Sequence, residues 1–318
     1  GYPIHQLKRT NVRSDYATDS IYANFRSIAT TGIKPGVIYR SSSPINNELG
    51  RAVYADNLCR AVGIQTVINL SDSKEEIAQY LAAPGFESDY YKSLLDAGKV
   101  IALDMGGVDY VTTSFGDKFV EGMRFLLAND GPYLIHCTEG KDRAGFVCAV
   151  LEALMGANLQ EILADYMKSY ENYYLVKSGI DQYKPVAESN IVTSMSTMMC
   201  GLPKGSNISG VNLSQFAEWY LLDIGLKQEE IHALNAKLSA EPVFKKPFVK
   251  GVVKQIEEDG SLLTDIPIQD FNSLGFSYGD KVTVVFGNGF VLEATYWDGY
   301  YSSNRGDPLV LADPRQDD

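Results

Sequence analysis

This chain has few cysteines and histidines for its length: four and three among 318 residues. Four cysteines, at positions 59, 137, 148 and 200, are too few to form a disulfide framework in a chain of this size. The histidines at positions 5, 136 and 232 are scattered, and no spacing of Cys, His and carboxylate residues is typical of a metal site. We therefore expect neither a metal ion nor a cofactor.

Long apolar runs, internal repeats and low-complexity tracts are also absent, so the sequence predicts no membrane span. Hydrophobic residues make up 45% of the chain, which is ordinary for a globular protein. The net charge is −12 and the isoelectric point is near 4.8. A field of this sign repels polyanions, which argues against nucleic acid or an anionic membrane surface as the main partner. An anionic ligand would have to bind at a local positive site.

The most informative stretch of the chain is LIHCTEGKDRAG, from Leu134 to Gly145. An apolar segment typical of a buried strand ends in His136 and Cys137, and Arg143 follows at the start of an apolar helix pattern. A buried cysteine after a strand is most often a small hydrophobe. Here, however, polar and charged residues crowd between two core elements, where a plain turn needs only Gly or Asn. This order of strand, loop and helix favours a functional loop.

The residue types in this loop suit hydrolysis of a phosphate ester through a cysteine. A free thiol has a pKa of about 8.5, and a helix N-terminus and the nearby Arg143 would favour its thiolate. Residues 138 to 143 can turn their N–H groups inward as an anion nest, with Gly140 taking the positive φ of a tight loop. The fork of Arg143 matches two phosphate oxygens. Asp142 could protonate the leaving oxygen and later activate water.

The motif His-Cys-x-x-Gly-Lys-Asp-Arg-x-Gly resembles the signature loop of the bacterial, dual-specificity branch of the protein tyrosine phosphatase superfamily. Members of this branch act on phosphotyrosine, and some act on phosphoinositides. The resemblance covers about residues 20 to 240 and includes the segments 24–26, 34–42, 63–70, 164–166 and 220–226. It implies a protein tyrosine phosphatase-like α/β fold.

The resemblance also implies roles for the loop residues. Cys137 would be the nucleophile, Arg143 the phosphate clamp and Asp142 the general acid and base. Lys141 would be a second cationic contact, although a solvated loop cation is the alternative. The remaining members of the phosphate-binding loop would be Thr138, Glu139, Gly140 and Ala144.

Two features depart from the family pattern. Most relatives carry Ser or Thr after the arginine, and this chain has Ala144, so we expect slow turnover of the phosphocysteine. The family strand that tends to end in Asp-Leu-Arg reads Asn69-Leu70-Ser71 here, which leaves the usual contribution of that Asp and Arg in doubt. Many phosphatases of the superfamily also carry the acid on a separate loop, so Asp104 or Asp109 is the alternative to Asp142.

Hydrophobic periodicity predicts a mostly parallel sheet flanked by helices, with the loop at the carboxyl ends of the strands. The expected strands are 37–40, 66–70 and 132–135, and the expected helices are 48–62, 73–83, 115–129, 144–155, 158–171, 186–200, 212–222 and 228–238. After about residue 238 the pattern changes to short alternating segments at 249–256, 262–266, 281–286, 290–296 and 309–311, separated by Asp-Gly, Gly-Asp and Gly-Asn-Gly turns.

These patterns predict two domains: a cysteine-dependent phosphatase domain at 1–240 and a small antiparallel, barrel-like β domain at 241–318. Segments 251–253 and 260–267 are similar to the β-barrel tail of bacterial S-adenosylmethionine hydroxide adenosyltransferases, but we carry no chemistry over from this short match. The role of the β domain is unknown, and binding of a partner is one candidate.

We therefore expect a phosphomonoester hydrolase that acts on phosphotyrosine, phosphoinositides, inositol phosphates or related phosphates. The alternative is a catalytically weak phosphate-binding or interaction module, which Ala144 and the β domain suggest. A sulfur-transfer enzyme or arsenate reductase can share the Cys-x5-Arg spacing, but the Lys141-Asp142 pair argues against it. The acidic, Tyr- and Asn-rich composition and a start at Gly1 favour a secreted or cell-surface bacterial protein, with the cytoplasm as the alternative.

Overall fold

The computed structural model describes residues 7–107, 109–239, 248–286, 291–299 and 307–312. The chain divides into two compact units, Gly1–Val243 and Phe244–Asp318. The N-terminal unit is a mixed α/β structure, and the C-terminal unit is a small β structure with one short helix.

The sheet of the N-terminal unit has five strands in the order β1-β2-β5-β3-β4. β1 pairs antiparallel with β2, and the other neighbours are parallel. The strands are β1 (Arg26–Ser27), β2 (Ile38–Ser41), β3 (Thr66–Asn69), β4 (Val100–Ala102) and β5 (Tyr133–His136). The three predicted strands are confirmed, and β1 and β4 are additions at the two edges. β5 is the central strand, so the residue that follows it lies at the middle of the sheet edge.

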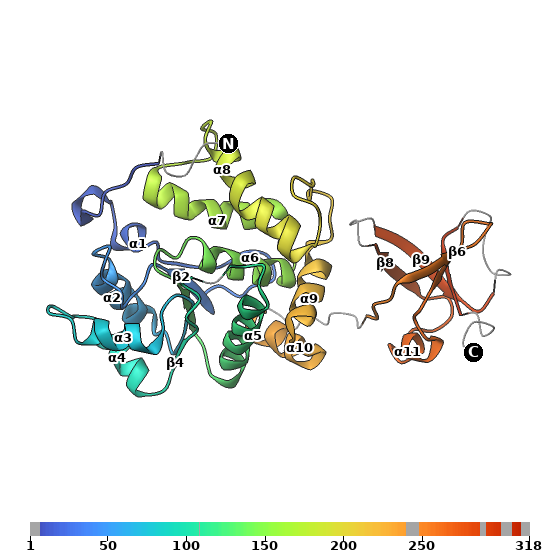
Figure 1. Cartoon of the computed structure of the whole chain (residues 1–318), viewed down its shortest axis with the longest axis horizontal. Coiled ribbons are helices and arrows are strands. Elements are labelled where there is room, and N and C mark those ends of the chain that lie inside the picture. Colours follow the sequence, from blue (N-terminus) through green and yellow to red (C-terminus); the bar gives the residue numbers. More distant parts are fainter. Residues whose placement is uncertain (1–6, 108, 240–247, 287–290, 300–306, 313–318) are drawn as a thin grey trace. The chain divides into compact units, whose positions relative to one another are not determined.

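Helices surround this sheet (Figure 1). They are α1 (Asp19–Tyr22), α2 (Ala52–Val62), α3 (Lys74–Leu81), α4 (Asp89–Asp96), α5 (Thr113–Ala128), α6 (Arg143–Met155), α7 (Leu159–Tyr174), α8 (Tyr183–Ala187), α9 (Leu213–Ile224) and α10 (Gln228–Leu238). A 3-10 turn precedes them at Arg13–Asp15. The predicted helix over 186–200 is instead the end of α8 followed by two π-helical turns, Glu188–Val192 and Met195–Met199.

Successive residues of the central strands point to opposite sides of the sheet, and both faces are buried because helices pack on each. Val67 and Leu134 pack in one core cluster with residues of α2 and α4. Ile68 lies on the other face, below α5, where a Cβ added to Gly122 would come within 3.3 Å of its Cγ2. All four residues of β3 and of β5 are buried, including the polar Thr66, Asn69 and His136.

Local sequence signals set several helix ends. The side chain of Ser73 accepts from the N–H of Glu76, and the carboxylate of Glu76 accepts from the N–H of Ser73, so the two residues form a capping box at the start of α3. The side chain of Asn212 caps α9 by accepting from the N–H of Gln215. Helix α6 lies deep in the unit, with every residue from Ala144 to Met155 buried and α7 and α9 packed against it.

The C-terminal unit contains two small sheets. β6 (Val253–Ile256) and β7 (Leu262–Thr264) form an antiparallel pair, and β8 (Lys281–Val285) pairs antiparallel with β9 (Val291–Trp297). β10 (Leu309–Leu311) joins β9 in parallel, a detail that departs from the predicted antiparallel pattern. Helix α11 (Ile268–Asn272) packs against this sheet, and the small core is built from Val282, Tyr296 and Ala312.

A buried ion cluster joins the first two strands to α7. Arg26 Nε lies 2.8 Å from one carboxylate oxygen of Asp165, and Arg40 Nη1 lies 2.6 Å from the other. Burial alone would raise the pKa of the Asp165 carboxyl, but the two guanidinium groups outweigh it and hold that pKa well below its usual range. Asp165 is therefore a carboxylate at all ordinary pH values, and it offsets the charges of two arginines.

We predict that Asp165→Asn lowers the free energy of unfolding by about 3 kcal/mol or more, because it leaves two buried guanidinium groups without their counter-charge. Urea denaturation at pH 7 measures this. The difference from wild type should shrink below about pH 4, where the unfolded chain protonates and the stabilisation by a depressed carboxyl is lost. Asp19→Asn, which breaks an exposed pair with Arg13, is the control and should cost less than about 1 kcal/mol. An equal effect of the two substitutions would contradict this account.

Candidate active site

The loop of residues 137–142 connects the end of β5 to the start of α6. It lies at the carboxyl end of the parallel strands, where ligand sites of such sheets form. Cys137, the first residue after β5, is 3% exposed, so its sulfur lies at the base of the loop rather than on the surface. Ala144, in the first turn of α6, is fully buried.

Outside donors hold the carbonyl groups of this loop. They come from three segments of the chain, at Asn24, at Arg40–Ser43 and at Tyr173, and bind four consecutive peptide oxygens. The bonds are Ser43 N to Thr138 O (3.0 Å), Tyr173 Oη to Glu139 O (2.7 Å), Asn24 Nδ2 to Glu139 O (3.2 Å), Arg40 Nη2 to Gly140 O (2.8 Å) and Arg40 Nη2 to Lys141 O (3.3 Å).

These bonds determine where the amide groups of the loop point. In a planar trans peptide, C=O and the following N–H point in opposite directions. Because the carbonyls of residues 138 to 141 face outward, the N–H groups of residues 139 to 142 face inward. Among the described residues, no protein acceptor binds these four N–H groups. The loop is therefore an anion nest of convergent donors.

Gly140 is required at its position for two reasons. Its φ is +68°, in the left-handed region that favours glycine. A Cβ built there would lie 2.2 Å from the carbonyl oxygen of Ser41, which leaves no space for any side chain. The predicted positive φ is confirmed, and the close approach to β2 is a second constraint that the sequence does not show.

His136 supports the loop from behind. Its ring is fully buried, with Nδ1 3.3 Å from the carbonyl oxygen of Cys137 and Nε2 3.2 Å from the hydroxyl of Tyr91. Burial lowers the pKa of His136 from 6.5 to about 4, so the ring is neutral at physiological pH. Asn69 donates to the same Tyr91 hydroxyl at 3.0 Å and to Asp72 at 2.9 Å. Asn69, which stands where the family pattern has Asp, thus links β3 to His136 through the hydroxyl of Tyr91.

Arg143 points from the first turn of α6 toward the segment that precedes α5. Its Nε donates to the carbonyl oxygen of Met105 at 2.6 Å, and its Nη2 donates to that of Gly106. A guanidinium has five N–H donors, so these two bonds leave others for an anion. The candidate phosphate clamp is therefore docked on the segment that carries Asp104 and Asp109.

Lys141 is buried, not solvated as the alternative interpretation required. Its side chain is 6% exposed, and its Nζ lies 3.2 Å from Asp142 Oδ2 and 3.5 Å from Glu139 Oε2. The same Nζ lies 5.1 Å from the ring centre of Tyr170. Burial opposes the charge, but the two carboxylates and the aromatic ring raise the pKa of Lys141. The ammonium charge is thus shared by two neighbours within its own loop.

The three candidate acids lie in different surroundings. The side chain of Asp142 is 48% exposed, and its Oδ1 accepts from Tyr166 at 3.5 Å. Asp104 is 62% exposed and 3.9 Å from Lys118 Nζ. Asp109 is also exposed, and its Oδ1 accepts from the N–H of Val111 at 3.2 Å, in the turn before α5.

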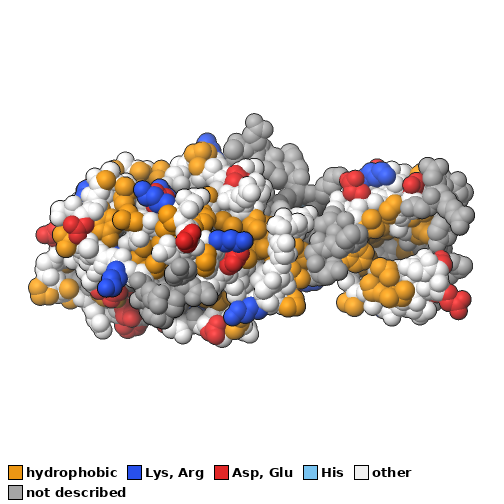
Figure 2. All heavy atoms as spheres, turned by 90° about the horizontal axis from the view of Figure 1, so that it is seen from above, with side chains coloured by type: hydrophobic (Ala, Val, Ile, Leu, Met, Phe, Trp, Pro, Cys, Tyr) orange, Lys and Arg blue, Asp and Glu red, His pale blue; other side chains and the backbone are white. Residues whose placement is uncertain are grey.

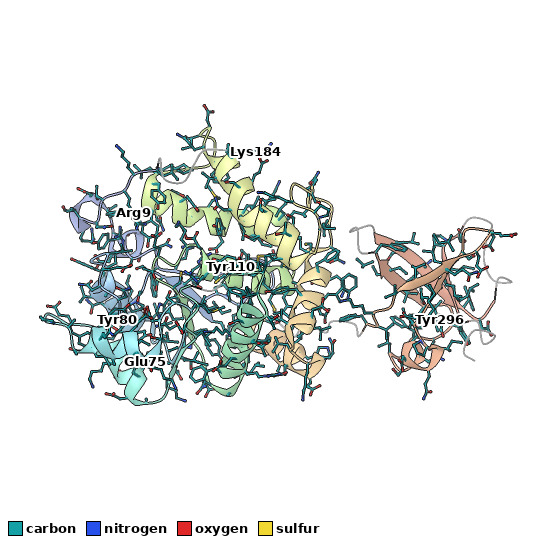
Figure 3. All side chains as sticks on the ribbon, viewed as in Figure 1. Arg9, Glu75, Tyr80, Tyr110, Lys184 and Tyr296 are labelled. Carbon is teal, nitrogen blue, oxygen red and sulfur yellow. The ribbon has the colours of Figure 1, made fainter. Side chains whose placement is uncertain are left out.

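Tyr110 is a residue of this site that the sequence did not single out. Its ring stacks on Phe146 of α6 with centroids 5.7 Å apart and an interplanar angle of 14° (labelled in Figure 3). Burial raises the pKa of Tyr110, and the nearby Asp142 and Cys137 side chains add to the effect. This places Tyr110 within electrostatic reach of both groups. Its only sequence signal is its place next to Asp109.

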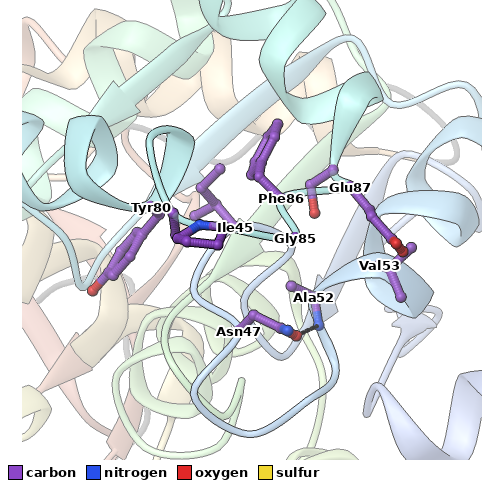
Figure 4. Close-up of a pocket in the computed structure, with 11 residues that line it drawn as sticks. Ile45, Asn47, Ala52, Val53, Tyr80, Gly85, Phe86 and Glu87 are labelled. Carbon is purple, nitrogen blue, oxygen red and sulfur yellow. Dashed lines mark hydrogen bonds between the residues drawn. The ribbon is translucent and has the colours of Figure 1, made fainter.

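A separate pocket of about 100 Å³ lies between the 45–53 and 80–88 segments (Figure 4). Tyr80 and Phe86 contribute its aromatic lining, and within it the side chain of Asn47 accepts from the N–H of Ala52 at 3.2 Å. Burial and the nearby Asp72 raise the pKa of Tyr80 to about 12. None of the predicted site residues lines this pocket.

The described surface carries charges of both signs. On the face shown in Figure 2, Lys and Arg side chains are interspersed with Asp and Glu side chains over the N-terminal unit. Among the described residues, no group of three or more His, Cys, Asp or Glu side chains is placed to hold a metal ion. No described helix is both long and apolar enough to cross a lipid bilayer.

Comparison with known proteins identifies the class. Residues 20–240 match the model of the tyrosine phosphatase family. The chain belongs to this family, and it is accordingly a phosphatase with a tyrosine phosphatase-like α/β fold and a separate small β unit.

Two curated relatives have names that agree with this assignment. The chain is 26% identical over 200 residues to the triple specificity protein phosphatase PtpB of Mycobacterium tuberculosis, a match that covers 50% of this chain and 71% of the relative. It is 28% identical over 218 residues to a tyrosine-protein phosphatase of Nostoc commune, with 60% and 72% covered. Among solved structures, the core catalytic domain of the PP-IP phosphatase SIW14 from S. cerevisiae, in complex with citrate, matches with 18% identity and a TM-score of 0.30, covering 52% of this chain and 91% of that one.

The buried, neutral His136 predicts a specific pH dependence of stability. Its imidazole takes up a proton near pH 6.5 in the unfolded chain but only near pH 4 in the folded one. The stabilisation is complete above about pH 6.5 and is lost as the pH falls toward 4. Relative to His136→Asn, the free energy of unfolding of wild type should fall by roughly 3 kcal/mol across this range. Denaturant titrations at several pH values test this, with exposed His232→Asn as the control; parallel curves for wild type and His136→Asn would refute it.

Proposed function

We propose that this phosphatase hydrolyses phosphomonoesters through a covalent phosphocysteine intermediate on Cys137. One observation carries the proposal: the N–H groups of residues 139 to 142 converge beside Cys137, while the carbonyl groups of residues 138 to 141 are bound on the outside of the loop. Donors fixed in this way need no reorganisation when negative charge spreads over the three oxygens of a transferring phosphoryl group.

The reaction has two steps. In the first, the sulfur of Cys137 attacks phosphorus while the bond from phosphorus to the leaving oxygen breaks, and Asp142 gives that oxygen a proton. In the second, water attacks the phosphocysteine, Asp142 takes a proton from the water, and the sulfur–phosphorus bond breaks to release inorganic phosphate. Arg143, held by the carbonyls of Met105 and Gly106, would bind phosphate oxygens with its remaining N–H donors. The buried Ala144 offers no hydroxyl to the departing sulfur, which supports the expectation of a slow second step.

We infer that the substrates are phosphotyrosine, phosphoinositides or related phosphates. The names of two relatives, a triple specificity protein phosphatase and a tyrosine-protein phosphatase, support this range. A screen of phosphopeptides, phosphoinositides and inositol phosphates with one purified sample would rank the substrates. Activity on none of them would favour the alternative of a phosphate-binding module.

Cys137→Ser should lower p-nitrophenyl phosphate turnover by about a thousandfold or more, because it removes the nucleophile of both steps. Cys200→Ser is a matched control, since that buried cysteine lies between the π-helical turns and α9 and should tolerate the change. Acid quenching during turnover, followed by mass spectrometry of the peptide that contains Cys137, should detect the phosphorylated thiol. Unchanged turnover in Cys137→Ser would end the proposal.

Asp142→Asn should slow alkyl phosphates by roughly a hundredfold and p-nitrophenyl phosphate much less, because only a poor leaving group needs a proton. It should also flatten the fall of kcat/KM toward higher pH, where the acid has lost its proton. Asp104→Asn and Asp109→Asn serve as matched comparisons, since each removes one exposed carboxylate before α5. A selective loss in either of these variants, with Asp142→Asn unaffected, would transfer the acid role.

Binding of a partner by the C-terminal unit stays a prediction. Exposed apolar side chains on and beside the β6–β7 pair support it: Val252, Val253, Ile256 and Leu262. Such surface is common at interaction sites. We also retain secretion or display at a bacterial cell surface as a proposal, supported by composition alone; fractionation of the source cells would test it.

A further inference from the structure

Four charged side chains of alternating sign connect the N-terminal segment to the candidate acid. Arg9 Nη2 lies 2.8 Å from Glu139 Oε1, and the other oxygen of Glu139 lies 3.5 Å from Lys141 Nζ. Lys141 Nζ in turn lies 3.2 Å from Asp142 Oδ2. Only Arg9 comes from outside the loop, and it lies 130 residues away in the sequence from its partner.

Arg9 is held in a fixed orientation by α7. Its guanidinium carbon lies 4.8 Å from the ring centre of Tyr173, and its Nη1 donates to the hydroxyl of Tyr174 at 3.3 Å. The hydroxyl of Tyr173 donates to the carbonyl oxygen of Glu139, so α7 holds both Arg9 and its partner (Arg9 is labelled in Figure 3). The side chain of Arg9 is 17% exposed, so water screens its charge only partly.

The charges of these four side chains depend on one another. Burial opposes the ionisation of Glu139, yet Arg9 and Lys141 lower its pKa. Burial also opposes the charge of Lys141, yet Asp142 and Glu139 are among the groups that raise its pKa. Lys141 faces two carboxylates with one positive charge. Because Arg9 neutralises Glu139, the ammonium of Lys141 is available to Asp142.

We propose that Arg9 is a positioning residue for Asp142: it acts through Glu139 and Lys141 to set the orientation and the charge balance of the catalytic acid. The inference rests on the proposed role of Asp142. Arg9 does not touch the reacting atoms, so it affects the reaction only by controlling how Lys141 divides between its two carboxylate partners.

Other groups also face Asp142 and remain in place when Arg9 is changed. They are the hydroxyl of Tyr166 and the side chain of Tyr170 from α7, and Tyr110 from the segment before α5, which itself lies near Cys137 and Arg143. These groups set a constant background. A shift of the pH profile on substitution of Arg9 or Glu139 therefore comes from the ion pairs that link them to Asp142.

Substitutions of Arg9 and of Glu139 should shift the pH profile in opposite directions. Arg9→Gln leaves Glu139 without its counter-charge, so Lys141 is drawn from Asp142 and the acid keeps its proton to higher pH. The basic limb of the kcat/KM profile, where activity falls, should shift to higher pH by about half a pH unit. This is the size expected for one partly screened charge at this separation. Glu139→Gln frees Lys141 for Asp142 and should shift the same limb to lower pH by a similar amount.

The double variant Arg9→Gln/Glu139→Gln should return the limb to near its wild-type position, because it removes one positive and one negative charge and their effects on Asp142 cancel. Arg9→Lys keeps the charge while changing the geometry, and it should also stay near wild type. Arg13→Gln, in the same N-terminal segment, is the control because the ion pair of Arg13 is with the exposed Asp19. Profiles should be measured with an alkyl phosphate, for which protonation of the leaving group limits the rate.

Each outcome has a distinct meaning. If wild type turns over the substrate but the limb is the same in Arg9→Gln and Glu139→Gln, or moves in the same direction in both, the inference is wrong and the proposed function stands. A purely structural role of Arg9 would lower kcat or stability without opposite shifts. If wild type and Cys137→Ser are equally inactive, the proposed function itself has failed.

Discussion

The binding of four peptide oxygens on the outer side of one short loop determines most of this site. A loop of consecutive inward N–H groups is unfavourable alone, because their dipoles repel and their carbonyls require partners. Arg40 meets part of this need from the neighbouring strand β2, and Tyr173 meets another part from α7. The sheet register places Arg40 beside Ile135, two residues before Cys137. Strand pairing and loop shape are thereby linked.

Arg40 is rigid because its other nitrogen pairs with Asp165, which Arg26 also binds. Removing two arginines and one carboxylate from water has a large free-energy cost, which a bare ion pair seldom recovers. The cost is offset here because both carboxylate oxygens and several N–H groups are bound, and one guanidinium also binds the loop. This cluster therefore acts as support for the loop and not simply as a source of stability.

Local patterns in the sequence predicted the central strands, the buried α6 and the positive φ of Gly140. These features depend on residues a few positions apart. Arg9 with Glu139, and Arg40 with Asp165, pair across more than a hundred residues, and no periodicity reports such a pairing. The edge strand β4 has three half-buried residues and no alternation to reveal it. The burial of Lys141 likewise depends on its contacts with Tyr170 and Glu139. The loop sequence alone therefore could not show whether this lysine is buried or solvated.

The acidic surface and the anion-binding loop are compatible because their effects act over different distances. At physiological ionic strength an exposed charge is screened within roughly 8 Å, so the net charge of −12 mainly affects the approach of a ligand. Within the loop, Lys141 is already matched by Glu139 and Asp142, and it adds little net attraction. Affinity for a dianion must then come from the four N–H groups and from Arg143, which act at contact distance in a low dielectric. Such a site favours groups small enough to enter the loop, and its selectivity depends on shape more than on long-range charge.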